Sequence, residues 1–236
     1  MGARSYDRTE IDTTAANQNL EVIKMAEFKP YPFFIRRAVR KYLKKEYGKD
    51  EAARLWEKTL QIYNGFVKEA PDIGGKENGM SGNLYLALAV FAFYEADGRK
   101  LTPDKLKELM SRQLPKSIPV LSALVDLNKP KNQHRLLARY EKYKTISDEK
   151  LDEGEWGNSW RIEMNLHGRK TGVAFDLVGC PLADFAKKHS YTEIMPVLCD
   201  FDYLTARLMH ARLFREHTVA TGSTYSDFWY LGDREA

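Results

Sequence analysis

Two cysteines in the C-terminal part of the sequence are the residues best suited to covalent chemistry. The chain has 236 residues and only these two cysteines, Cys180 and Cys199, and Asp202 follows Cys199 by three positions. Residues three apart lie on one side of a helix, so the spacing predicts a thiol and a proton acceptor in one cleft. A lone carboxylate raises the pKa of a neighbouring thiol, and activation of Cys199 therefore requires a cation such as Arg215 or a histidine nearby.

The second thiol, Cys180, stands where a predicted strand ends and Pro181 begins a helix. The amide groups of a helix amino end favour negative charge, and this position is expected to lower the thiol pKa. The alternative is that Cys180 is a small buried apolar residue, as many free cysteines are.

A third group of residues follows in the segment LFREHTVA. A strand over Leu213 to Ala220 puts Arg215 and His217 on one face, because strand side chains alternate. Arg215 is then predicted to bind a substrate carboxylate, and His217 to act as a general acid or base. The alternative is a solvent-facing row of side chains. Asp227, which follows the turn TGSTYS, is predicted to orient His217 across the hairpin or to bind a substrate amine.

Metal and nucleotide sites have weaker support. The cysteines and histidines lack the close pairing that marks a zinc site, although ligands far apart in sequence can converge, so a thiol-ligated metal enzyme is kept as a minor hypothesis. The glycine-rich stretch GGKENGMSG has no Lys-Ser/Thr pair of a phosphate-binding loop. We therefore expect no cofactor and no metal.

Helical periodicity dominates the first part of the chain. The run NLYLALAVFAFYEA is apolar on nearly all sides, which predicts a helix buried among others. The expected organisation is a flexible arm over 1–20, a helical region over 21–155 and an α+β catalytic region over 156–236, with the last two packed as one unit. The predicted helices are 33–47 (ended by Gly48), 50–69, 82–96, 103–113 (capped by Thr102), 118–127 and part of 129–155.

Beyond residue 155 the period changes. Segments 160–166 and 172–178 are typical of strands, 181 onward and 192–210 of helices, and 213–220 and 227–231 of two more strands, with Gly222 in the turn between them. The order β-β-α-α-β-β predicts an α+β fold in which a small antiparallel sheet carries helices on one face.

Composition excludes several functional classes. The formal charge of +4 is small and dispersed, which argues against nucleic acid as a partner. The longest apolar run, Leu84 to Tyr94, is about half of what a membrane span needs. The polar amino-terminal stretch does not read as an export signal, so we expect a cytoplasmic protein with free thiols, and the pattern allows a homo-oligomer.

The C-terminal motifs resemble a known family. The succession FDLVGCPLADFAKKH, MPVLCDFDY and REHTVATGSTYSDFW is similar to the L-2-amino-thiazoline-4-carboxylic acid hydrolase family. The shared positions are Cys180, the Cys199 and Asp202 pair, Arg215, Gly222 and Asp227. The chain departs from the family pattern at Ser226, where many members have a cysteine directly before the aspartate.

The resemblance implies hydrolytic opening of a small carboxylate-bearing nitrogen heterocycle, such as a cyclic amidine, isothiourea or amide, by thiol-assisted or general-base addition of water. Cys199 is the preferred nucleophile over Cys180, with Asp202 and His217 as proton carriers, and Arg215, Asp227 and Gly222 at the substrate. The alternative hypothesis is a non-catalytic module that binds or senses a small molecule in the same pocket.

Overall fold

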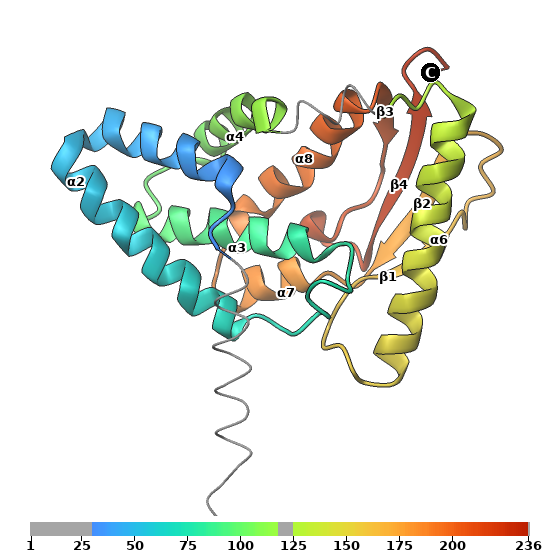
Figure 1. The fold of residues 1–236 in the computed structure, drawn as a ribbon, viewed down its shortest axis with the longest axis horizontal. Coiled ribbons are helices and arrows are strands. Elements are labelled where there is room, and N and C mark those ends of the chain that lie inside the picture. Colours follow the sequence, from blue (N-terminus) through green and yellow to red (C-terminus); the bar gives the residue numbers. More distant parts are fainter. Residues whose placement is uncertain (1–29, 118–124, 236) are drawn as a thin grey trace, which may run out of the picture.

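The computed structural model describes residues 30–117 and 125–235. Helices form the first part of the chain, and a four-stranded antiparallel sheet with further helices forms the second (Figure 1), which confirms the predicted α+β class. The predicted arm over 1–20 lies outside the described residues. So does most of the helix predicted over 118–127, of which residues 125–127 are not helical.

One of the amino-terminal helices is almost wholly buried. This helix is α3 (Ser81–Ala96), and its lack of a polar face explains why it needs partners on several sides. The helices α2 (Phe33–Glu69) and α4 (Pro103–Ser117) pack against each other, and α2 also packs on α3. The amide of Lys105 donates to Thr102, as the predicted cap requires. A fourth helix, α6 (Pro130–Asp152), leads to the sheet.

Gly48 divides α2 into two helical arms. The sequence predicted helices over 33–47 and 50–69 that are separated at this glycine, and the non-helical backbone of Gly48 confirms the break. Gly48 has φ 77° and ψ −180°, a conformation that suits glycine, and helical geometry continues on both sides of it. Figure 1 shows the resulting two arms of α2. Buried residues on both arms, among them Leu43 and Tyr63, keep each arm against the core.

The sheet has the strand order β1-β2-β4-β3, with all neighbours antiparallel. Two helices connect the first hairpin to the last two strands, as the β-β-α-α-β-β pattern predicted. The elements are β1 (Arg161–Met164), β2 (Val173–Val178), α7 (Pro181–Lys188), the short 3-10 helix η1 (Thr192–Ile194), α8 (Met195–Leu208), β3 (Ala211–Phe214) and β4 (Tyr225–Gly232).

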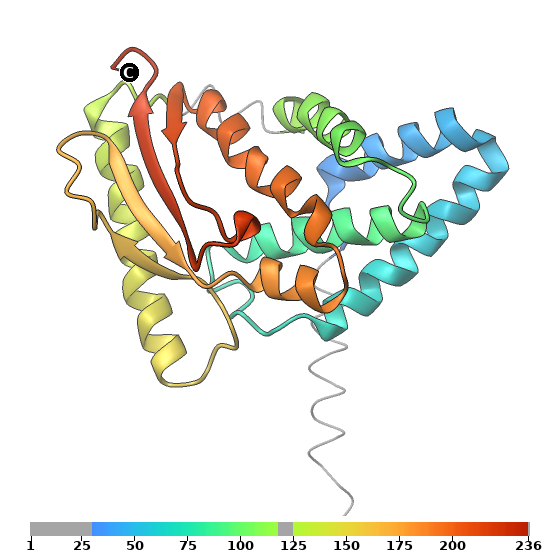
Figure 2. The ribbon, with the colours of Figure 1, turned by 180° about the vertical axis from the view of Figure 1, so that it is seen from behind.

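Helices cover one face of this sheet. The rings of Phe175 on β2 and Phe228 on β4 stack on this face at 4.9 Å, and Tyr140 of α6 lies 3.9 Å from Phe175 between ring centroids. The opposite face carries Asp176 and Trp229, and the indole of Trp229 donates to the Thr171 carbonyl in the loop that joins β1 to β2. Figure 2 shows the sheet from behind, with α6 beside β1 and α8 beside β3.

The third strand is shorter than predicted. The sequence placed a strand over 213–220, but β3 ends at Phe214 and a 3-10 helix, η2 (Val219–Thr221), follows. Beyond Phe214 the side-chain carboxylate of Asp227, and not the backbone of a neighbouring strand, accepts the amide groups of Glu216 and His217.

One hydrophobic core joins the helical region to the sheet. It contains Phe91 of α3 together with Phe185 of α7 and Phe201 of α8. The division of the chain near residue 155 stays a prediction. No helix within the described ranges 30–117 and 125–235 has the length and apolar character required to cross a bilayer.

Candidate active site

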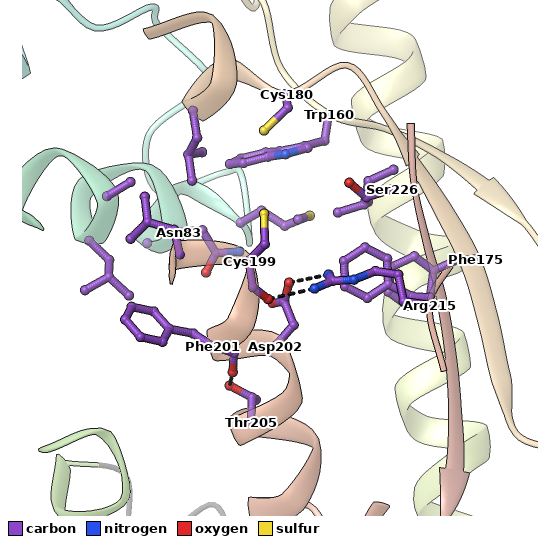
Figure 3. Close-up of a pocket in the computed structure, with 18 of the residues that line it drawn as sticks. Asn83, Trp160, Phe175, Cys180, Cys199, Phe201, Asp202, Thr205, Arg215 and Ser226 are labelled. Atoms are coloured by element: carbon purple, nitrogen blue, oxygen red, sulfur yellow. Dashed lines mark hydrogen bonds and ion pairs between the residues drawn. The ribbon is translucent and has the colours of Figure 1, made fainter. Parts of the chain in front are cut away.

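A cavity of about 420 Å³ lies where α3, α7 and α8 meet the covered face of the sheet. Cys180, Cys199, Asp202 and Arg215 all line it, although they come from three different parts of the C-terminal region: the start of α7, α8 and the segment after β3. Figure 3 shows both sulfur atoms and the Arg215–Asp202 pair around this space. A cavity of this size can hold a small molecule. The thiols, the carboxylate and the guanidinium that were predicted to lie together therefore line one possible binding site.

Cys180 occupies the cap position of α7, with Pro181 as the first helical residue. The amides of Leu182 and Ala183 and the indole of Trp160 lower the pKa of its thiol, as expected for a helix amino end. Burial acts more strongly in the opposite direction, and the net result is a raised pKa. The sequence-based expectation of a lowered pKa was therefore wrong, because it counted the amides without the desolvation.

Cys199 lies on α8 and its thiol is a poor acid. Burial raises its pKa to about 12, the charge of Asp202 adds to the effect, and Arg215 opposes it. The thiol is consequently protonated at neutral pH and must lose its proton as it reacts. Both cysteines are free and partly accessible.

Arg215 and Asp202 form the charged pair of the cavity. Arg215 Nη1 donates to Asp202 Oδ2 at 2.8 Å, and Nη2 donates to the Cys199 carbonyl at 2.7 Å. The guanidinium lies 4.9 Å from the Tyr203 ring and 5.0 Å from the Phe228 ring, which fixes its position by cation–π contacts. Burial raises the pKa of the Asp202 carboxyl, and Arg215 opposes this shift. Asp202 is thus held as a proton acceptor that is stronger than an ordinary carboxylate.

His217, Asp227 and Gly222 are not among the described residues that line the cavity. The predicted common face for Arg215 and His217 was wrong, since the strand ends at Phe214. His217 instead stacks on Tyr225 at 5.1 Å, and its Nδ1 lies 3.7 Å from Asp227 Oδ1 on the opposite side of the sheet. Gly222 ends η2 with φ 96°, so it serves the predicted turn. Roles for these three residues at the substrate stay predictions.

Several polar lining residues were missed by the sequence analysis. Asn83 is a polar residue in the first turn of a largely apolar helix, and that contrast is a signal that could have been used. Trp160 and Tyr140 gave no comparable signal, because their place at the cavity depends on long-range packing. The polar residues found only in the structure are Asn83, Tyr140, Trp160, Thr205 and Tyr230.

No cluster of three or more potential metal ligands was found in the part of the chain that the structure describes. The side chains at the cavity that could bind a metal are two thiols and one carboxylate. The carboxylate already accepts a hydrogen bond from Arg215. The arrangement supplies a nucleophile, a proton acceptor and a fixed cation, which together suit addition of a thiol or water to an electrophilic carbon.

Comparison with protein families gives this arrangement a context. The profile of the L-2-amino-thiazoline-4-carboxylic acid hydrolase family matches residues 82–230, from the first turn of α3 to β4. The chain belongs to this family. Searches of curated proteins and of solved structures gave no match. The family match includes all the residues that line the cavity except Met80, and the family name describes a hydrolase.

Ser226 occupies the position at which the sequence analysis expects a cysteine in many members of the L-2-amino-thiazoline-4-carboxylic acid hydrolase family. Ser226 stands before Asp227 on β4 and lines the cavity, and its Oγ accepts the Val219 amide at 3.1 Å. Figure 3 shows Ser226 across the cavity from Cys199. A cysteine here would add a third thiol to the same space, and the serine replaces it with a hydroxyl that also anchors η2.

Proposed function

We propose that this protein hydrolyses a small cyclic amidine or isothiourea, opening the ring in the cavity between α3, α8 and the sheet. The observation that carries the proposal is the placing of Cys199 and Asp202 on one wall of a cavity of about 420 Å³. The family name supports a ring of the aminothiazoline carboxylate type.

The proposed reaction begins with the Cys199 thiol. Sγ adds to the amidine carbon while its proton passes to Asp202, and the electron pair of the C=N bond moves to nitrogen. The adduct then re-forms a C=N bond as the bond from carbon to the ring heteroatom breaks, and Asp202 returns the proton to that heteroatom. Water next adds to the same carbon and releases the thiol. The net change is addition of one water to the substrate.

Proton transfer to Asp202 is needed because the pKa of the Cys199 thiol is raised to about 12. A raised pKa of Asp202 improves its ability to accept that proton. Direct attack by water, with Asp202 as the base and no covalent intermediate, uses the same geometry. His217 lies on the other side of the sheet, so Asp202 is the carrier within reach of the cavity.

The test is a ring-opening assay in which mass spectrometry detects the gain of one water by L-2-amino-thiazoline-4-carboxylate and by related cyclic amidines. Asp202→Asn is expected to lower kcat/KM by roughly 10²–10⁴-fold, the range typical of a lost general base. Asp200→Asn is the matched control, because Asp200 lies on the same helix and pairs with Lys107 instead of facing the cavity.

The cysteine variants separate the two routes. Cys199→Ser is expected to abolish turnover if the thiol is the nucleophile, whereas full activity in this variant assigns the attack to water. Full activity in both Cys199→Ser and Cys180→Ser eliminates thiol catalysis. Binding of the rings without any mass change would contradict hydrolysis and favour the sensory alternative.

A further inference from the structure

Two tyrosine side chains, Tyr140 of α6 and Tyr230 of β4, line the cavity without a role in the mechanism above. Tyr230 is 5% exposed, and Tyr140 is half-buried. Neither hydroxyl forms a hydrogen bond with any of the residues that the structure describes. Hydroxyl groups in buried positions are nearly always hydrogen-bonded, so this pair indicates where a polar group of a ligand binds.

Both hydroxyls keep their protons at neutral pH. Burial raises the pKa of Tyr140 to about 12, and the charge of Asp202 adds to this effect. Burial also raises the pKa of Tyr230 well above its ordinary value, with further contributions from Tyr140 and Asp202 and an opposing one from Arg215. A protonated phenol donates a hydrogen bond, so the pair suits an acceptor such as a carboxylate.

Strand β4 shows where Tyr230 lies relative to the reacting groups. Its residues Ser226, Phe228 and Tyr230 all line the cavity, as alternation along a strand requires. The guanidinium of Arg215, which pairs with Asp202, lies 5.0 Å from the Phe228 ring. The charged pair is therefore beside the middle one of these three residues, and Tyr230 lies about 7 Å further along the strand.

Helix α8 runs in the same direction as β4. It leads into β3, whose first residue pairs with the last residue of β4, so the end of α8 lies at the Tyr230 end of the sheet. Figure 3 shows Cys199, Asp202 and Thr205 in this order along the helix. The sulfur of Cys199 and the hydroxyl of Tyr230 consequently lie on opposite sides of Asp202 along the cavity.

Arg215 is poorly accessible to a ligand carboxylate. Its side chain is 2% exposed, and its Nη atoms donate to Asp202 and to the Cys199 carbonyl. The Tyr203 and Phe228 rings lie close to the guanidinium, at 4.9 Å and 5.0 Å. Arg215 still offsets the charge of Asp202, so an anionic group can bind nearby if uncharged donors hold it.

Three other groups in the cavity can donate a hydrogen bond to a carboxylate. They are the Gly82 amide and the Asn83 side chain at the amino end of α3, and the Ser226 hydroxyl. Gly82 and Asn83 are exposed, so water already satisfies them and a ligand gains less by replacing it. Ser226 lies across the cavity from Cys199, so the attacked carbon, and not the ring substituent, lies between these two residues. These observations favour the tyrosine hydroxyls.

We propose that Tyr140 and Tyr230 bind the carboxylate of the substrate and so direct the amidine carbon of the ring toward Cys199. This inference rests on the proposed function and on the carboxylate in the family name. In a ring 4-carboxylate the substituted carbon is not bonded to the amidine carbon, so the carboxylate points away from the attacked atom, as the separation of Tyr230 from Cys199 requires. Asp202 Oδ2 stays bound to Arg215, and Oδ1 remains to accept the Cys199 proton.

The experiment removes each hydroxyl, in Tyr140→Phe, Tyr230→Phe and the double variant, and compares two rings. L-2-amino-thiazoline-4-carboxylate carries the anionic group, and unsubstituted 2-amino-2-thiazoline lacks it. Each single variant should lower kcat/KM for the carboxylate by at least about tenfold, which corresponds to roughly 1.4 kcal/mol, and should leave that for the unsubstituted ring nearly unchanged. Tyr143→Phe is the matched control, because Tyr143 is a buried tyrosine of α6 that is not among the described residues lining the cavity.

Three results overturn the inference and leave the hydrolase proposal intact. The first is an unchanged kcat/KM for the carboxylate in the double variant. The second is an equal loss for both rings, which would place the hydroxyls at the reacting atoms or in the fold. The third is a loss specific to the carboxylate in Asn83→Ala or Ser226→Ala but not in the tyrosine variants, which would assign the carboxylate to those donors. If the double variant does not fold, the single variants decide.

Binding decides the inference if the native protein opens neither ring, an outcome that contradicts the hydrolase proposal itself. Dissociation constants for both rings are then measured by calorimetry with the native protein and the tyrosine variants. Weaker binding of the carboxylate by at least about tenfold in Tyr230→Phe, with unchanged binding of the unsubstituted ring, supports the inference. Equal affinity of the native and variant proteins for the carboxylate, or no binding of it by the native protein, overturns it.

Discussion

Asp227 Oδ1 accepts the backbone amide of His217 at 2.5 Å. The same carboxylate accepts the Glu216 amide at 3.0 Å, so it holds the chain directly after Arg215. It does so from the side of the sheet that faces away from the cavity. Asp227 therefore positions Arg215, and through it Asp202, without being among the lining residues described.

Replacing Asp227 by alanine should weaken both the fold and the site. Two amides lose their acceptor, which is expected to cost about 1–3 kcal/mol of unfolding free energy, and kcat/KM should fall because Arg215 is no longer held. Urea unfolding and the ring-opening assay measure the two effects. Asp227→Asn, which retains one oxygen, should be intermediate. An effect on KM alone, with unchanged stability, would instead indicate direct contact with a substrate amine.

Arg215 sets the pH at which Asp202 can accept a proton. The guanidinium stabilises the ionised carboxylate, so its removal in Arg215→Met should raise the pKa of Asp202 above its already raised value. The base is then protonated at a higher pH, and the acidic limb of the kcat/KM profile should move to higher pH. Arg215→Lys keeps the charge and should move the limb less. An acidic limb that is the same in all three proteins would show that Asp202 is not the titrating base.

The raised pKa of Cys199 predicts slow alkylation. In a Cys180→Ser background, labelling of Cys199 by iodoacetamide at pH 8 should be slower than that of a free cysteine and should increase with pH toward the pKa of about 12. Asp202→Asn removes a charge that raises this pKa, so labelling should accelerate, by about tenfold for each unit that the pKa falls. Asp200 is a weaker influence on Cys199, and Asp200→Asn should change the rate little.

Asp176 is expected to lower the stability of the protein at neutral pH. Its residue is 3% exposed, and burial raises its pKa, with further contributions from Asp227 and Glu163 and an opposing one from His167. A raised folded-state pKa gives stability that is present below the unfolded-state pKa of about 3.9 and is lost as the pH rises through the folded-state value.

Asp176→Asn cannot ionise, so it should be more stable than the native protein at pH 7, and the difference should shrink below about pH 4. Chemical denaturation at several pH values measures it. The half-buried neighbour Glu163, which pairs with Lys144, provides the control, since Glu163→Gln should have a smaller effect. A destabilised Asp176→Asn protein at neutral pH would mean that the contact between Asp176 and His167 outweighs the cost of burial.

Local patterns in the sequence predicted most of the fold. The apolar run NLYLALAVFAFYEA predicted a buried helix, alternation predicted β1, and a short apolar run with β-branched residues predicted β2. The break at Gly48 was also predicted, because its conformation suits glycine. The end of β3 was not, because Asp227, from another strand, accepts the amides of the residues that follow Phe214.

The candidate site, like the fold, was predicted from the sequence only in part. The thiols, Asp202 and Arg215 were found from residue chemistry and spacing, and the cavity includes all four. The accessibility of Arg215 was not predictable, because the aromatic rings that cover it and the carboxylate that pairs with it meet only after folding. Asn83 reaches the cavity from a helix almost a hundred positions before Cys180, so its polar character within α3 marks the residue but does not predict which groups it joins.

Because α3 contributes to the cavity, the protein can be inactivated without a change to any reactive side chain. Asn83 and Leu86 supply one wall, while the sulfur atoms and Asp202 supply the others. A C-terminal fragment that begins near residue 155 would carry all the groups proposed to react, yet its cavity would be open to bulk water on that side. Proteolytic clipping that lets α3 dissociate should accordingly abolish turnover without touching a reactive side chain.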